Sequence, residues 1–114
     1  MIRTIVALAA ALCLLAGAAH AAETLQIGAM PLGSIWYVFA ASFAKVIQPA
    51  LPPGSNIEII ARGGGIGNPV VVNDGKAAIA IANSSTSNWA FNGEQEIYKG
   101  KKHQNIRGLL GGLN

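Results

Sequence analysis

Residues 57–69, IEIIARGGGIGNP, are the most informative stretch for the fold, because an apolar β-branched run there leads into a cluster of glycines. β-Branched side chains favour strands, and glycine permits the tight turns that follow them. Asn68 and Pro69 are typical of a helix start, as an N-cap followed by a proline in the first turn. The stretch therefore predicts a strand, a turn at 62–68 and a short helix over 69–73.

The same order of elements precedes this stretch. Residues 25–29 alternate apolar and polar side chains and run into a Pro-Gly loop, which predicts another strand and turn. Ser34 is a candidate N-cap for the helix that follows, and Pro52 is its predicted stop. An apolar stripe at helical spacing marks this helix: Phe39, Phe43, Val46, Ile47 and Ala50.

The order recurs downstream. Residues 78–82 form a run of small apolar side chains, as in a buried parallel strand. Residues 83–86 offer several N-caps for a short helix near residues 87–91, and residues 106–110 resemble the start of a fourth strand. The alternation predicts an α/β fold in which helices flank a parallel sheet.

The strand-to-helix turns at 31–37, 62–68 and 83–86 should share one edge of that sheet, where ligands bind in folds of this class. Each turn opens a helix, whose free amides and positive dipole end attract anions. Convergence of these turns predicts a site for a carboxylate or a similar anion. Arg62 would add a bidentate cation, and Trp36 and Tyr37 would add an aromatic wall.

Every one of these residues also has a purely structural interpretation. Ser34 and Asn68 fit as helix caps, and residues 63–65 fit as a flexible turn. Trp36 and Tyr37 fit as core residues of an amphipathic helix. The prediction of a site therefore depends on the shared edge and not on any single side chain.

The 114-residue chain is 52% hydrophobic and only 11% charged, and its first segment supplies much of that apolarity. A cationic start, an apolar run over residues 4–16 and an A-x-A pattern at 19–21 predict a secretory signal peptide over residues 1–21, cleaved after Ala21. The apolar run is shorter than the ~20 residues that cross a bilayer. We expect residues 22–114 to be exported to the periplasm and to fold without disulfides, since they contain no cysteine.

The sequence contains no recognisable catalytic or metal-binding pattern. His103 lies in a basic loop without a partner at ligand spacing, and the carboxylates form no acid/base pair. The glycines at 63–67 lack the G-x-G-x-x-G frame and the Gly-Lys-Ser/Thr ending of a phosphate loop. The net charge of +3 is too small and too scattered to indicate nucleic acid. We predict that the chain is not an enzyme and that it uses no metal or other cofactor.

The turns carry a family resemblance. Residues 28–37, GAMPLGSIWY, resemble the opening of TAXI-type solute receptors, the extracytoplasmic binding subunits of tripartite ATP-independent periplasmic (TRAP) transporters. The matching continues in order over most of the chain at GGGIGN (63–68), DGKAAIA (74–80), WAFNG (89–93) and IRGL (106–109). The sequence departs from the family pattern at Ile35, where many members have a hydroxyl residue, and at Ala78, where they have Asp.

The resemblance implies a two-lobed type II periplasmic-binding fold that captures a small organic anion, such as an amino acid or a dicarboxylate. It implies delivery of that solute to membrane subunits of a transporter, and we expect the receptor to be a monomer. Residue by residue, the resemblance assigns these positions to the ligand cleft: Gly33, Ser34 and Tyr37 from the first turn, Gly64, Gly65 and Asn68 from the second, and Asn83, Ser84 and Ser85 from the third.

Family members run to roughly three hundred residues, so the sequence predicts residues 22–114 to be a partial first lobe without its second lobe. Ligand binding by such a fragment should be weak, because half of the cleft is absent. The alternatives are a binding subunit of another transporter or sensor with the same fold, a non-functional truncated fragment, and an exported α/β enzyme with catalytic residues elsewhere.

Overall fold

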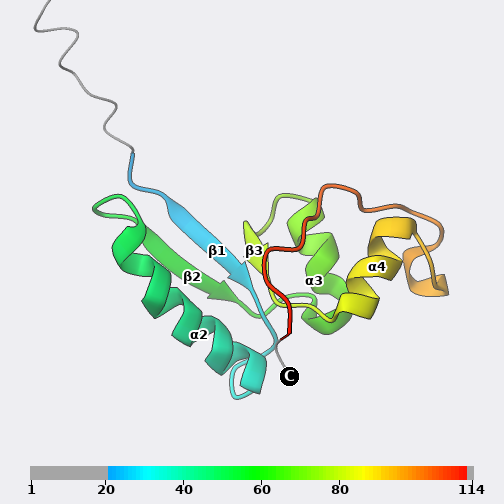
Figure 1. The fold of residues 1–114 in the computed structure, drawn as a ribbon, viewed down its shortest axis with the longest axis horizontal. Coiled ribbons are helices and arrows are strands. Elements are labelled where there is room, and N and C mark those ends of the chain that lie inside the picture. Colours follow the sequence, from blue (N-terminus) through cyan, green and yellow to red (C-terminus); the bar gives the residue numbers. More distant parts are fainter. Residues whose placement is uncertain (1–20, 113–114) are drawn as a thin grey trace, which may run out of the picture.

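The computed structural model describes residues 21–112, and within them a parallel three-stranded sheet organises the fold (Figure 1). The strands are β1 (Thr24–Gly28), β2 (Asn56–Ile60) and β3 (Ile79–Ala80), in the order β2-β1-β3. The helices are α2 (Ile35–Ile47), α3 (Gly64–Asn73) and α4 (Ser84–Asn92), with 3-10 turns η1 (Gln48–Ala50) and η2 (Glu96–Tyr98). The predicted α/β class, with a parallel sheet flanked by helices, is confirmed. The structure is that of a small α/β unit compatible with part of a periplasmic-binding lobe.

The signal peptide is predicted for residues 1–21, and residues 1–20 lie outside the described part of the chain. Among the described helices, none combines the length and the apolarity that crossing a membrane requires.

β1 lies at the centre of the sheet and pairs along its whole length with β2, from Thr24 opposite Asn56 to Gly28 opposite Ile60. Its other edge pairs with β3 over only two residues. Hydrogen bonds from the amides of Ala78 and Ile81 to β1 carbonyls, each 3.0 Å long, extend this contact at both ends. The predicted strand over 78–82 is therefore present but shorter.

The core lies between the sheet and α2, around Ile27, Ala29 and Ala40, which are fully buried. Phe43 and Ile47 pack against it, as the apolar stripe predicted. The prediction that the remaining stripe residues face the core was wrong. Val46 and Phe39 are exposed, and Ala40 and Ala44 face the core instead. α2 also ends at Ile47, and the chain continues to Ala50 as the 3-10 turn η1.

α3 differs most from its prediction. Gly63, in a left-handed conformation with φ +82°, is the N-cap, and the helix begins at Gly64 instead of Pro69. Asn68 and Pro69 are therefore buried inside the helix, and the prediction that Asn68 caps it was wrong. Glycine has a poor helix propensity, but burial of this helix against the sheet and α4 overrides it.

Pro69 inside α3 has no amide hydrogen to donate to the carbonyl of Gly65, four residues earlier. The Thr86 hydroxyl of α4 donates to this carbonyl at 2.7 Å instead. The contact between α3 and α4 therefore supplies the hydrogen bond that the proline removes.

The prediction of a fourth strand over residues 106–110 was wrong. The structure assigns no strand to residues 106–110, which run as an irregular segment beside β3 without pairing to the sheet (Figure 1). α4 was predicted over 87–91 and spans Ser84–Asn92, ending at Gly93 in the left-handed conformation typical of a C-cap.

Ser34 caps α2 as predicted, with its hydroxyl accepting a hydrogen bond from the Tyr37 amide at 3.1 Å. We expect Ser34→Ala to lower the free energy of unfolding by about 1 kcal/mol, because one helix-end amide loses its partner. Ser42→Ala is the matched control, since the exposed Ser42 hydroxyl only donates back to the Val38 carbonyl within the same helix. Urea unfolding followed by circular dichroism measures both, and equal effects of the two substitutions would contradict the capping role.

Candidate functional site

The structure brings the strand-to-helix turns together around Gly65. A β-carbon at Gly65 would lie 3.4 Å from Cη2 of Trp36, in the first turn of α2, and 3.5 Å from Nδ2 of Asn83, the N-cap of α4. A β-carbon there would make ordinary van der Waals contacts with both side chains, so the starts of α2, α3 and α4 lie close to one another at Gly65. The predicted convergence at one edge of the sheet is therefore present in the geometry.

The first turn contributes Gly33, Ser34 and Tyr37. Gly33 is exposed with φ +91°, a conformation that favours glycine. Ser34 and Tyr37 are half-buried, and the Ser34 hydroxyl already accepts the Tyr37 amide as a cap. That hydroxyl still has a proton to donate, so capping does not exclude a contact with an anion.

Asn83, Ser84 and Ser85 are exposed at the start of α4. The Asn83 side chain forms no capping hydrogen bond, while its backbone carbonyl accepts from the Thr86 hydroxyl at 3.0 Å and from the Ser87 hydroxyl at 2.9 Å. The third turn therefore presents an amide group and two hydroxyl groups to solvent beside the free amides of a helix end.

Asn68 lies beneath the turns and not on their surface. It is fully buried, and its Nδ2 donates to the carbonyl of Ile81 at 2.7 Å. Its Oδ1 has no hydrogen-bond partner in the described residues, and it would lie 3.4 Å from a β-carbon at Gly28, the last residue of β1. Asn68 thus links α3 to the carboxyl ends of β1 and β3.

The helix ends at this edge carry no compensating negative charge. None of α2, α3 and α4 has an acidic residue in its first turn. The exposed Arg62 side chain immediately precedes the glycines of the second turn. The positive ends of the helix dipoles and this cation therefore favour an anion at the edge.

Sequence reasoning missed the role of Thr86. This residue is buried, and its hydroxyl bridges the Gly65 and Asn83 carbonyls, which belong to the second and third turns. A signal for it exists in the sequence, because a proline at position 69 of a longer helix leaves the Gly65 carbonyl without a donor. Recognising that signal required knowing that α3 begins at Gly64.

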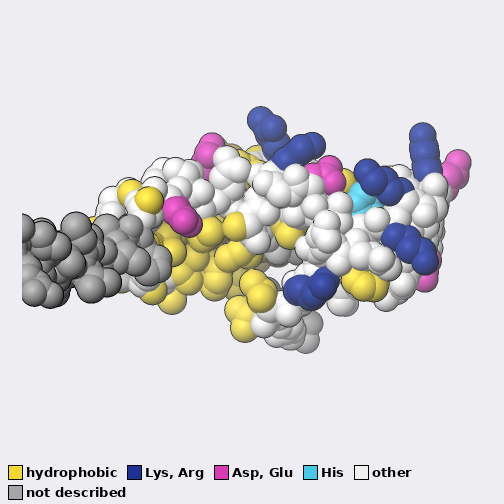
Figure 2. Space-filling model, turned by 90° about the horizontal axis from the view of Figure 1, so that it is seen from above, with side chains coloured by type: hydrophobic (Ala, Val, Ile, Leu, Met, Phe, Trp, Pro, Cys, Tyr) yellow, Lys and Arg dark blue, Asp and Glu magenta, His cyan; other side chains and the backbone are white. Residues whose placement is uncertain are grey.

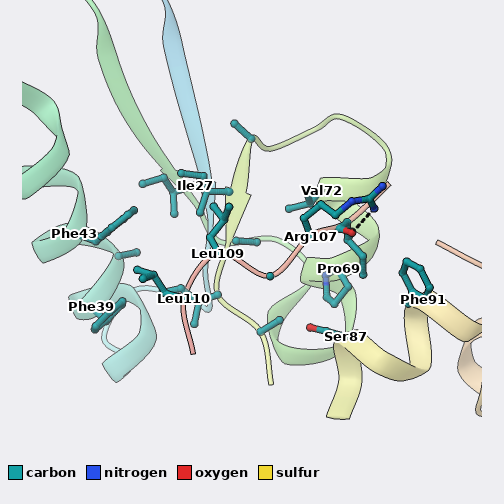
Figure 3. Close-up of a pocket in the computed structure, with 18 of the residues that line it drawn as sticks. Ile27, Phe39, Phe43, Pro69, Val72, Ser87, Phe91, Arg107, Leu109 and Leu110 are labelled. Atoms are coloured by element: carbon teal, nitrogen blue, oxygen red, sulfur yellow. Dashed lines mark hydrogen bonds between the residues drawn. The ribbon is translucent and has the colours of Figure 1, made fainter. Parts of the chain in front are cut away.

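A separate apolar hollow of about 490 Å³ lies beside the outer edge of β3 (Figure 3). Ile27, Phe39 and Phe43 line one side of it, and α3 and α4 contribute Pro69, Val72 and Phe91 to the other. Leu109 and Leu110 of the irregular C-terminal segment lie between these walls, and both remain more than two-thirds exposed. None of the predicted site residues lines this hollow, so it does not coincide with the edge where the turns meet. In the described residues, no three His, Cys, Asp or Glu side chains form a potential metal site.

Comparison with known proteins gives one match. A family model described as the NMT1-like family matches residues 27–111, which is more than half of the chain. No curated protein and no solved structure was found to match. The matched family is periplasmic-binding-protein-like, so the match supports a substrate-binding function in a transport system, with a small-molecule ligand; such families typically bind their ligands without transforming them. The chain belongs to the NMT1-like family.

Proposed function

We propose that the chain is the solute-binding component of a TRAP transporter of the TAXI type. It is exported to the periplasm after cleavage of residues 1–21. It holds a small organic anion, such as an amino acid or a dicarboxylate, and delivers it to membrane subunits. The family supports the binding role, and the resemblance of residues 28–37 and 63–68 to TAXI receptors supports the transporter type.

One observation supports an anionic ligand. The starts of α2, α3 and α4 meet around Gly65, and none of these helices has an acidic residue in its first turn. An anion at this edge would receive hydrogen bonds from free amides of α3 and α4 and from the hydroxyls of Ser84 and Ser85. Arg62 would add a charge-assisted contact. Gly33, Ser34 and Tyr37 would form the opposite wall. Gly64, Asn68 and Asn83 would position the turns.

The test is a titration of the isotope-labelled 114-residue chain with glutamate and with succinate, followed by NMR. We expect dissociation constants of about a millimolar, because the described residues supply only the part of a two-lobed cleft that belongs to one lobe. Backbone amide shifts should concentrate in residues 34–37, 64–65 and 83–86. Uncharged succinamide should produce no comparable shifts.

The double substitution Ser84→Ala with Ser85→Ala should weaken binding about fivefold and leave stability unchanged within about 0.5 kcal/mol, because both side chains are exposed. Ser42→Ala, on an exposed part of α2 away from the turns, should change neither quantity. The absence of shifts with both anions, or equal shifts with succinamide, would contradict the proposed site.

A further inference from the structure

A second hollow lies on another face of α3. It has a volume of about 680 Å³, within the range of small-molecule sites. On α3 it is lined by Gly63, Ile66, Gly67 and Val70, whose spacing places them along one side of the helix. The residues that face the turns and the sheet, Gly65 and Asn68, lie on a different side, so the second hollow is distinct from the proposed anion site.

The opposite wall of the second hollow is the segment from Ile97 to His103. Tyr98 and His103 are buried in it, with ring centroids 5.8 Å apart in an edge-to-face arrangement. The Tyr98 hydroxyl donates to the Ile66 carbonyl at 2.8 Å, and the His103 amide donates to the Ala90 carbonyl at 2.9 Å. Burial raises the pKa of Tyr98, so this hydroxyl remains a donor at neutral pH. The wall is therefore fixed against both α3 and α4.

The backbone on both sides of η2 is strained. Gln95 and Lys99 have φ values of +63° and +50°, and they are the non-glycine residues with positive φ in the described chain. Such conformations cost of order 1–3 kcal/mol and cluster at functional sites. Here they orient Ile97 and Tyr98, which lie between them, toward α3 and into the lining of the hollow.

The lining combines an apolar floor with a cationic rim. Ile66, Val70 and Ile97 supply the apolar part, and both isoleucines are about half exposed. Lys99 and Lys101 form the rim, and neither makes an ion pair within 4 Å in the described residues. Cationic side chains gather over this half of the molecule, whereas apolar side chains gather over the half that contains α2 (Figure 2).

The acidic groups of this region are Glu94 and Glu96, which are exposed at and before η2, and Asp74, which follows the last residue of α3. The pKa of Asp74 is lowered, first by a hydrogen bond from the Asn73 amide and then by the positive charges of Lys101 and Lys76 and by His103. Lys76 forms the ion pair with Asp74, at 3.7 Å, whereas Lys101 interacts with the Asp74 charge without an ion pair, so Asp74 offsets only part of the positive charge of the rim.

His103 adds an unsatisfied polar atom to this wall. The residue is only 4% exposed, and its Nδ1 has no hydrogen-bond partner in the described residues. A buried polar atom without a protein partner costs roughly 1–3 kcal/mol unless a water or another polar molecule pairs with it.

We propose that the hollow between α3 and residues 97–103 is a second binding site, which takes an organic anion with an apolar body. The carboxylate lies at the rim between Lys99 and Lys101, and the hydrocarbon part covers Ile66, Val70 and Ile97. This proposal does not depend on the anion site proposed at the strand-to-helix turns, because no residue assigned to that site lines the hollow.

Hexanoate is the test ligand. Acetate, which lacks the apolar body, and 1-hexanol, which lacks the charge, are the comparison ligands. We expect hexanoate to shift the methyl signals of Ile66, Val70 and Ile97 in the 114-residue chain, with a dissociation constant of about a few millimolar. Acetate and hexanol should bind at least about tenfold more weakly, since each lacks one of the two contributions.

Lys99→Met with Lys101→Met should weaken hexanoate binding about tenfold, because methionine keeps the side-chain length and removes the charge. Lys102→Met is the matched control: Lys102 is exposed in the same loop but does not line the hollow. Ser84→Ala with Ser85→Ala should leave the hexanoate shifts unchanged, which separates this site from that of the turns.

Three results would overturn the proposal. One is the absence of methyl shifts at about 20 mM hexanoate, an excess that would saturate a site of the expected affinity. Another is equal binding of hexanol, which would make the hollow merely apolar. The third is an equal loss of affinity in Lys102→Met, which would show that the loss comes from the overall charge of the loop and not from Lys99 and Lys101.

Discussion

Gly63→Ala should destabilise the chain by about 3 kcal/mol or more, a large part of the stability of a small domain. A β-carbon at Gly63 would lie 2.5 Å from the carbonyl carbon of Gly67 and 2.8 Å from the Asn68 nitrogen. Both atoms belong to the backbone of α3, so neither can move away as a flexible side chain would. The φ of +82° adds the strain of a left-handed conformation for any L-residue with a side chain.

Gly67→Ala provides the matched control in the same glycine cluster. A β-carbon at Gly67 meets no atom within 4 Å, and the residue lies inside α3. Alanine should therefore stabilise the helix by about 0.5–1 kcal/mol. Urea unfolding monitored by circular dichroism measures both variants. Similar midpoints for the two would contradict the assignment of Gly63 as the N-cap of α3.

The strands and the first helix cap follow from local information. The β-branched run at 57–61 and the alternating run at 25–29 form strands in any context that buries one face, and Ser34 can reach its amide within a single turn. The register between β1 and β2 and the order β2-β1-β3 required the structure, since they depend on which faces the helices cover.

The errors share one physical cause, namely tertiary contacts that outweigh local propensity. Glycines at 63–67 favour a turn when considered alone, yet packing against α4 makes most of them helical. Residues 106–110 have a strand-like pattern, but in the described structure they pair with no strand and line the hollow beside β3 as an irregular segment. An apolar β pattern specifies a strand only when a sheet edge pairs with it.

The sequence predicted the location of the candidate site better than it predicted what each residue does there. The turns converge because parallel strands place their carboxyl ends at one edge, and this holds for Gly65, Trp36 and Asn83. The ligand contacts assigned to Gly33, Ser34, Tyr37, Gly64, Gly65, Asn68, Asn83, Ser84 and Ser85 remain predictions. Burial separates Asn68 from the rest, because a fully buried amide supports the turns from beneath.

This supporting role makes Asn68→Asp the second substitution with a large expected effect. At pH 7 we expect a loss of roughly 3–5 kcal/mol, because an uncompensated carboxylate would face the Ile81 carbonyl in a fully buried position. Asn68→Ala is the control. It removes the 2.7 Å hydrogen bond without adding charge, so its cost should be lower, at about 1–3 kcal/mol.

The dependence on pH separates the two variants. Burial and the facing carbonyl raise the pKa of the introduced carboxyl group in the folded state above its unfolded value. Its protonated form can donate to the Ile81 carbonyl, so the penalty is smallest below the unfolded pKa and grows as the pH rises through the folded one. The gap in unfolding free energy between Asn68→Asp and Asn68→Ala should therefore narrow from pH 7 to about pH 4. A gap that stays constant over that range would mean that the position 68 side chain reaches solvent, and Asn68 would then belong to the ligand-facing surface of the turns and not to their support.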